Sequence, residues 1–72
     1  MPGTKEHRRF CQNDGWELYK STDHDFYRKL LPNGVYLTTF ISRGTKEYSP
    51  EMFAKILKQQ LHCDKTYFNS KI

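Results

Sequence analysis

The chain has 72 residues, 36% of them hydrophobic and 15% aromatic, which predicts a single domain (residues 1–72) with one small core. No apolar run is long enough to span a membrane and the first residues lack a signal-peptide pattern, so we expect a cytoplasmic protein without a membrane partner. Twelve Lys and Arg against eight Asp and Glu give a net charge of +4, which suits a nucleic-acid partner or an ordinary basic surface.

A short helix is predicted over residues 4–14, which contain few strand formers and no interior Gly or Pro. His7, Phe10 and Cys11 fall at the i, i+3, i+4 spacing of one helix face. Gly15 then ends the helix, since glycine readily adopts the positive φ found there.

Three strands are predicted next, over residues 16–20, 24–31 and 35–42. Each is rich in aromatic or β-branched side chains, which favour strands. Residues 32–34, Pro-Asn-Gly, have the turn chemistry of a tight hairpin between the second and third strands.

A second helix is predicted from Ser49, which supplies an N-cap oxygen ahead of Pro50 and Glu51. Its apolar stripe consists of Phe53, Ile56, Leu57, Gln60 and Leu61. Lys55 and Lys58 lie off this stripe, where they would contact phosphates or form a solvated face. Asp64 is a candidate cap for a last short turn. The expected fold is therefore α+β, an α-β-β-β-α chain whose antiparallel three-stranded sheet is covered by two helices.

His24, at the start of the second strand, is the candidate catalytic residue. An imidazole is the side chain best suited to exchange protons near neutral pH. Strand alternation places His24, Phe26 and Arg28 on one face of the sheet. The sequence does not decide which face the helices cover, and a histidine at the edge of the core would be structural.

The order of these motifs resembles the HicA (YcfA-like) toxin family of type II toxin–antitoxin systems. The similar elements are Gly-Trp-Glu at 15–17, the strand-opening histidine with Asp-Phe-Tyr at 24–27, Asn-Gly at 33–34, Ser-Arg-Gly at 42–44 and the helix 56–61. The resemblance covers residues 10–61. It departs from the family at Thr22 and Asp23, because the family usually has Gly-Ser before the histidine.

The resemblance implies a double-stranded-RNA-binding-like fold and an mRNA endoribonuclease that needs no metal or other cofactor. It also implies a cognate HicB-like antitoxin that covers the active site. The family's catalytic histidine corresponds to His24. In such a reaction the RNA 2′-OH attacks the adjacent phosphate, so the protein must accept a proton and stabilise the charge on the phosphate.

The residues near His24 suggest how the remaining tasks are divided. The candidate phosphate-binding cations are Lys20, Arg28, Arg43 and Lys46. Asp23 or Asp25 could orient the imidazole ring. We therefore interpret His24 as a general base, worth a factor of about 10² to 10⁴ in rate.

Other interpretations remain open. Tyr19, Tyr27, Tyr36 and Phe40 could stack on RNA bases or build the core. The spacing of His7 and Cys11, with His62 and Cys63 after the second helix, would allow a zinc site. Since no Cys-x-x-Cys pair is present, two half-buried free thiols are expected instead. The alternatives to a nuclease are an RNA-binding module that does not cleave and a protein-interaction domain, such as a small viral or plasmid inhibitor.

Overall fold

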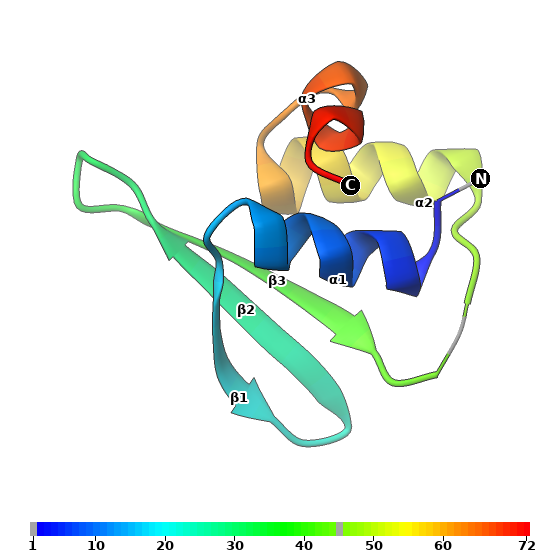
Figure 1. Cartoon of the computed structure of the whole chain (residues 1–72), viewed down its shortest axis with the longest axis horizontal. Coiled ribbons are helices and arrows are strands. Elements are labelled where there is room, and N and C mark those ends of the chain that lie inside the picture. Colours follow the sequence, from blue (N-terminus) through cyan, green and yellow to red (C-terminus); the bar gives the residue numbers. More distant parts are fainter. Residues whose placement is uncertain (1, 45) are drawn as a thin grey trace.

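The computed structural model describes residues 2–44 and 46–72. In chain order its elements are α1 (Thr4–Asn13), β1 (Glu17–Ser21), β2 (His24–Leu30), β3 (Tyr36–Ser42), α2 (Pro50–Lys55), η1 (Ile56–Leu61) and α3 (Lys65–Ser70) (Figure 1). The structure confirms the α+β class and the antiparallel three-stranded sheet, whose strand order is β1-β2-β3. None of the described helices is long and apolar enough to cross a membrane.

The helices cover one face of the sheet. Phe26 pairs with Phe40 and Tyr27 with Thr39 across β2 and β3, and the side chains of Tyr27, Thr39 and Ile41 are buried. Figure 1 shows the helices gathered over β3, whereas β1 lies outside their cover and all five of its residues are exposed. Residues that alternate with the buried ones on β2 and β3 therefore face away from the helices.

A stack of three phenylalanines joins the helices to one another. Phe68 of α3 lies parallel to Phe10 at 5.0 Å and edge-on to Phe53 at 5.0 Å between ring centroids. Asp64 starts α3 by accepting a hydrogen bond from the Tyr67 backbone N–H at 2.7 Å. The predicted cap at Asp64 is thus confirmed. The short turn expected after it is the helix α3, which contributes the fully buried Phe68 to the core.

The helical segment after β3 begins as the sequence predicted. The Ser49 hydroxyl accepts from the Met52 N–H at 3.2 Å, and Pro50 occupies the first helical turn. The apolar members of the predicted stripe are all buried. From Ile56 onward the helix widens into the π-helix η1, which ends at His62 in a left-handed conformation with φ of 53°.

His7 connects α1 to the sheet through a buried chain of hydrogen bonds. The Tyr48 hydroxyl lies 2.8 Å from Nδ1, Thr39 Oγ1 lies 2.9 Å from Nε2, and Thr39 donates in turn to Gln60 Oε1 at 2.5 Å. Because Thr39 gives its one proton to Gln60, the proton of His7 belongs on Nε2. Burial, together with the charge of Arg8, lowers the pKa of His7 to about 4, so the ring is neutral at neutral pH.

Candidate nucleic-acid interface

The face of the sheet that the helices leave uncovered carries His24 and most of the aromatic side chains outside the core. We call it the open sheet face. Its residues include Tyr19 and Lys20 of β1, His24, Phe26 and Arg28 of β2, and Tyr36, Thr38, Phe40 and Ser42 of β3. Tyr36 and Phe40 are about half exposed, at 50% and 48%. An uncovered patch of this kind on a small protein commonly marks a binding surface.

His24 packs into the aromatic part of the open sheet face. Its ring centroid lies 5.7 Å from that of Phe40 and 6.3 Å from that of Phe26. Its Nδ1 is buried and has no hydrogen-bond partner, so Nε2 is the nitrogen placed to reach a ligand. The sequence left open which face of the sheet the helices cover. In the structure, His24 lies on the face opposite the helices.

Two of the expected phosphate-binding cations share the open sheet face with His24. Lys20 Nζ lies 5.4 Å from the centre of the Phe26 ring, against which His24 also packs. The Arg28 guanidinium lies 5.2 Å and 5.0 Å from the rings of Tyr19 and Tyr36, respectively. Four residues of strand separate Arg28 from His24, about 13 Å, so the two side chains cannot hold the same phosphate.

Arg28 also has a carboxylate partner of its own. Its Nη2 lies 2.9 Å from Oε1 of Glu17, and its Nε donates to the same oxygen at 3.0 Å. The ion pair is exposed, so an anionic ligand can compete for the guanidinium. Of the cations on the open sheet face, Lys20 is therefore better placed to act with His24.

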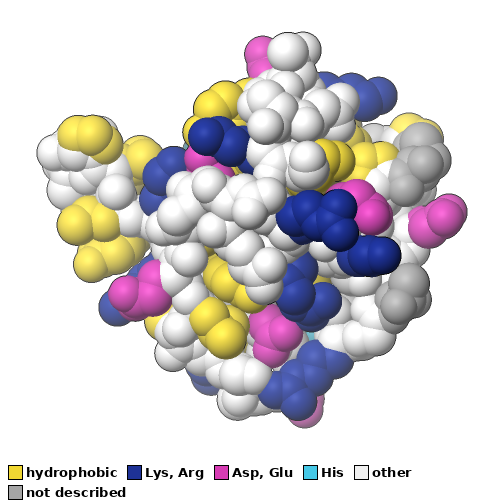
Figure 2. All heavy atoms as spheres, viewed as in Figure 1, with side chains coloured by type: hydrophobic (Ala, Val, Ile, Leu, Met, Phe, Trp, Pro, Cys, Tyr) yellow, Lys and Arg dark blue, Asp and Glu magenta, His cyan; other side chains and the backbone are white. Residues whose placement is uncertain are grey.

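Asp25 lies on the other face of β2 and binds two arginines. Its carboxylate accepts from Ser21 Oγ at 2.9 Å and from Arg8 Nη2 at 3.1 Å, and Arg43 Nε lies 3.6 Å away. The hydrogen bond from Ser21, helped by the two arginines, holds the pKa of Asp25 below its ordinary value. Figure 2 shows Lys and Arg side chains running from α1 toward this end of the sheet.

No hydrogen bond joins the His24 ring to Asp23 or Asp25 in the part of the chain that the structure describes. The orienting role suggested for these carboxylates therefore has no contact to support it, and Asp25 instead holds Arg8 and Arg43 together. Sequence reasoning missed Arg8. Its position in α1, one residue after the buried His7, carries no local signal that it meets the start of β2.

The other two expected cations lie near the end of β3. Arg43 follows Ser42, the residue paired with His24, and its guanidinium contacts both Ser21 and Asp25. Lys46 is exposed, and its backbone exchanges hydrogen bonds with Thr4 at the start of α1. Arg43 is thus adjacent to the His24 end of the sheet, whereas Lys46 belongs to the loop that contacts α1.

The aromatic residues proposed to stack on bases divide between the two faces. Tyr27 is buried beneath the helices, so of its two possible roles, stacking on bases or building the core, it has the core role. Tyr19, Tyr36 and Phe40 are exposed on the open sheet face. A ring from β1 reaches this face because the register shifts between Leu18 and Lys20, which leaves Tyr19 as an extra residue in the strand.

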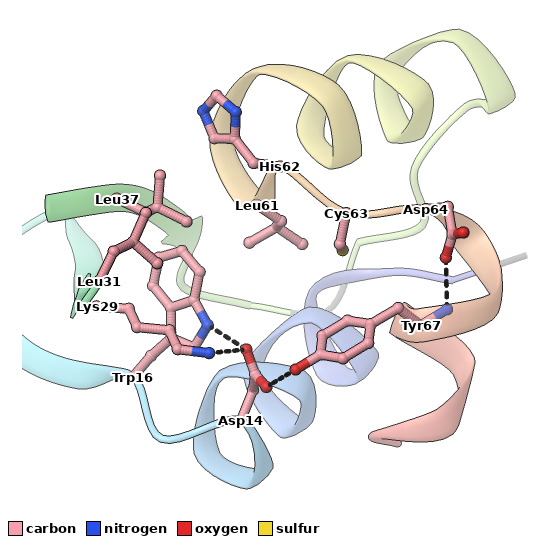
Figure 3. A pocket seen from close by; sticks show the side chains of 10 residues that line it. All are labelled: Asp14, Trp16, Lys29, Leu31, Leu37, Leu61, His62, Cys63, Asp64 and Tyr67. Carbon is pink, nitrogen blue, oxygen red and sulfur yellow. Dashed lines mark hydrogen bonds and ion pairs between the residues drawn. The ribbon is translucent and has the colours of Figure 1, made fainter. Parts of the chain in front are cut away.

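A cavity lies on the helical side of the sheet, away from His24 (Figure 3). It measures about 380 Å³ and lies between Trp16 and Leu37 on one side and Leu61 on the other. Asp14 forms its polar end by accepting hydrogen bonds from Trp16 Nε1 at 3.0 Å, Lys29 Nζ at 2.9 Å and the Tyr67 hydroxyl. Burial by itself would raise the pKa of Asp14, but these three hydrogen bonds outweigh it and lower the pKa.

Neither cysteine is placed for metal binding or nucleophilic chemistry. Both thiols are free, Cys11 fully buried and Cys63 partly so. Burial raises the pKa of Cys11 to about 12 and that of Cys63 to about 11, so both stay protonated at neutral pH. Figure 3 shows the side chains of His62 and Cys63 pointing apart, and residues 2–44 and 46–72 contain no cluster of three potential ligands for a zinc ion.

The chain was compared with protein families, curated proteins and solved structures. No family model, no curated protein and no solved structure matches the chain.

Proposed function

We propose that the chain is a HicA-like endoribonuclease toxin that holds RNA on the open sheet face and uses His24 in cleavage. The observation that carries this proposal is the position of His24, which lies against Phe26 and Phe40 on the uncovered face, with Lys20 over the same Phe26 ring. The chain's net charge of +4 favours a polyanionic partner. Exposed rings and cations are the groups that bind unpaired RNA.

The arrangement of the elements also supports the proposal. A first helix, three antiparallel strands and a later helix follow one another in the α-β-β-β-α order, with the helices on one face of the sheet. We infer that this is a double-stranded-RNA-binding-like fold whose free sheet face serves as the active surface. Helix α3 then extends the helical layer beyond the minimal pattern.

The surroundings of His24 favour one tautomer. Its Nδ1 is buried without an acceptor, and a buried N–H without a partner costs about 1–3 kcal/mol. The neutral ring therefore carries its proton on Nε2 and donates toward the open sheet face, where a phosphate oxygen or the leaving 5′ oxygen would lie. To accept a proton from RNA through Nε2, His24 must instead carry its own proton on Nδ1. The ring must then turn when RNA binds, so that the Nδ1–H meets a hydrogen-bond acceptor.

The test is cleavage of an unstructured, end-labelled RNA by the purified chain without added metal, with His24→Gln as the variant. We expect the wild type to produce fragments ending in 2′,3′-cyclic phosphate and His24→Gln to be at least about 100-fold slower. His62→Asn is the matched control, since Asn tolerates the left-handed backbone at that position. Equal cleavage by wild type and His24→Gln would remove His24 from the mechanism.

A non-catalytic RNA-binding module on the same fold is the second candidate. The specific observation in its favour is the unpartnered Nδ1, since a histidine base usually has its second nitrogen held by an acceptor. This candidate predicts that the wild type binds the RNA without cutting it. His24→Gln would then weaken RNA binding only by the contribution of one ring to that surface.

The toxin assignment has a cellular test of its own. Induced expression in a bacterial host should arrest growth and fragment mRNA with the wild type and not with His24→Gln. A HicB-like antitoxin that covers the open sheet face should abolish cleavage in the purified system. Growth arrest by both variants would instead indicate toxicity that does not depend on His24.

A further inference from the structure

A hollow of about 290 Å³ lies on the open sheet face. Its lining includes Tyr19, Phe26, Thr38 and Phe40 from the three strands and Gln59 and Gln60 from η1. Two of these rings, Phe26 and Phe40, are the ones against which His24 packs. The Phe26–Phe40 pair thus lies between the imidazole and the hollow, and the helical side of the molecule contributes one wall of the hollow.

The walls of this hollow combine flat apolar surfaces with amide groups. The Phe26 and Phe40 rings lie 6.1 Å apart at 39°. Gln60 accepts from Thr39 through Oε1 and keeps its amide N–H groups, while Gln59 is exposed and forms no side-chain hydrogen bond to a described residue. The volume is below that of a typical drug-sized site, so the fitting ligand is a small flat ring with polar edges.

A second hollow lies on the other side of Phe40. It measures about 210 Å³, and its lining includes Met52, Lys55 and Gln59. Phe40 and Gln59 line both hollows, so Lys55, which lines the second, supplies a cation next to the residues that the two hollows share. An aromatic surface, an amide and a nearby cation together fit a nucleotide, whose base stacks, whose edge forms hydrogen bonds and whose phosphate is anionic.

We propose that the hollow over Phe26 and Phe40 binds one unpaired nucleobase next to the scissile phosphate, and that Gln59 reads the edge of this base. The inference rests on the proposed RNA-cleaving function, because the base is delivered by the same strand that His24 contacts. Stacking on Phe40 holds any base, and the Gln59 amide favours the base whose donor and acceptor match it. The hollow is therefore the specificity site of the nuclease.

The test compares wild type, Gln59→Ala and Gln12→Ala on an RNA pool with random sequence, by sequencing the cut ends. Gln12 is an exposed residue of α1 that lines neither hollow, which makes it the matched control. We expect the wild type to prefer one base at a fixed position beside the cut. Gln59→Ala should reduce this preference about tenfold, whereas Gln12→Ala should retain it.

A second variant, Phe40→Leu, separates stacking from base reading. It should slow cleavage of all sequences alike by about tenfold, because stacking does not depend on base identity. Cleavage by the wild type without any base preference, or a preference that Gln59→Ala retains, would overturn the inference and leave the nuclease function standing. A wild type that neither binds nor cuts RNA would overturn both.

The same variants test a second copy of the chain as the occupant of the hollow. Light scattering coupled to size-exclusion chromatography should give the same monomer mass for wild type, Gln59→Ala and Phe40→Leu. A wild-type dimer that Phe40→Leu dissociates would assign the hollow to self-association and overturn the inference.

Discussion

Asp25 shows how one side chain sets the charge pattern around the candidate site. With Arg8 and Arg43 on either side of it, removal of its charge leaves two cations close together. We expect Asp25→Asn to lower the free energy of unfolding by about 1 kcal/mol, as for partly exposed ion pairs. Urea denaturation at neutral pH measures the effect, with Asp23→Asn as a control in the exposed turn. Equal losses in the two variants would contradict this role.

The contribution of Asp25 should also depend on pH. Its folded-state pKa lies below the ordinary value, so its stabilisation is present above the unfolded pKa, about 4, and is lost as the pH falls through the folded value. At a pH below the folded-state pKa of Asp25, wild type and Asp25→Asn should therefore converge in stability. A stability difference that persists at that pH would show that the variant is destabilised by a change of side-chain shape and not by the loss of charge.

Position 3 has no room for a side chain, so glycine is required there. Its φ of −142° is open to any residue, but a Cβ at this position would collide with the carbonyl oxygen of Lys46. That carbonyl accepts from the Thr4 N–H at 2.8 Å, so it cannot move without loss of a hydrogen bond. We expect Gly3→Ala to reduce the free energy of unfolding by about 1–3 kcal/mol, measured by urea denaturation.

The matched control for Gly3 is Gly15→Asn. A Cβ at Gly15 would meet nothing within 4 Å, and asparagine tolerates its positive φ of 80°. The free energy of unfolding should fall less in Gly15→Asn than in Gly3→Ala. A greater loss at Gly15 would show that backbone conformation outweighs the steric contact at Gly3.

At the scale of the elements, the docking of α1 depends on a histidine that must stay neutral. The folded-state pKa of His7 is about 4 against 6.5 for the free side chain, so below pH 6.5 the unfolded chain binds a proton that the folded chain does not. Stability should therefore fall as the pH drops from about 6.5 to about 4, by about 3 kcal/mol in total.

Denaturation of wild type, His7→Gln and His24→Gln across this pH range measures the effect. His7→Gln should flatten the dependence and His24→Gln should retain it. Should His7→Gln not fold, the titration of the His7 ring can be followed by NMR in the wild type. A midpoint near 6.5 would contradict the role assigned to burial.

The elements themselves were largely predictable, because the signals that set them are local. Ser49 and Pro50 mark the start of α2, and Asn33-Gly34 marks the hairpin, within a few residues of the structures they specify. The covered face of the sheet was not predictable. Both faces of β2 carry an aromatic residue, Phe26 on one and Tyr27 on the other, so alternation alone does not say which is buried.

The candidate site was predictable only in part for the same reason. His24, Lys20 and Arg28 share a face because strand alternation requires it. The ion pairs of Asp25 join α1 to the sheet, and no short-range pattern reports such a contact. Gln59, which the predicted stripe left outside the core, reaches the open sheet face only because η1 packs along β3.

At the scale of the whole molecule, the net charge of +4 should make RNA binding depend on salt. For a single strand, each phosphate neutralised adds about 0.7 to the slope of log affinity against log salt. We expect Lys20→Gln to reduce this slope by about 0.7, whereas Lys65→Gln, on α3, should leave it unchanged. Fluorescence anisotropy with an unstructured RNA in a salt series measures both. Equal slopes in wild type and Lys20→Gln would exclude Lys20 from the contact.

The extra residue in β1 has a consequence for the molecule in concentrated solution. β1 is an edge strand, and a regular edge strand with free N–H and C=O groups can pair with the edge of another molecule. The register shift at Tyr19 interrupts that edge, and Lys20 adds a charge directly after it. The irregularity that brings Tyr19 onto the open sheet face thus also protects the chain from sheet-to-sheet polymerisation, and deletion of Tyr19 would expose it to aggregation.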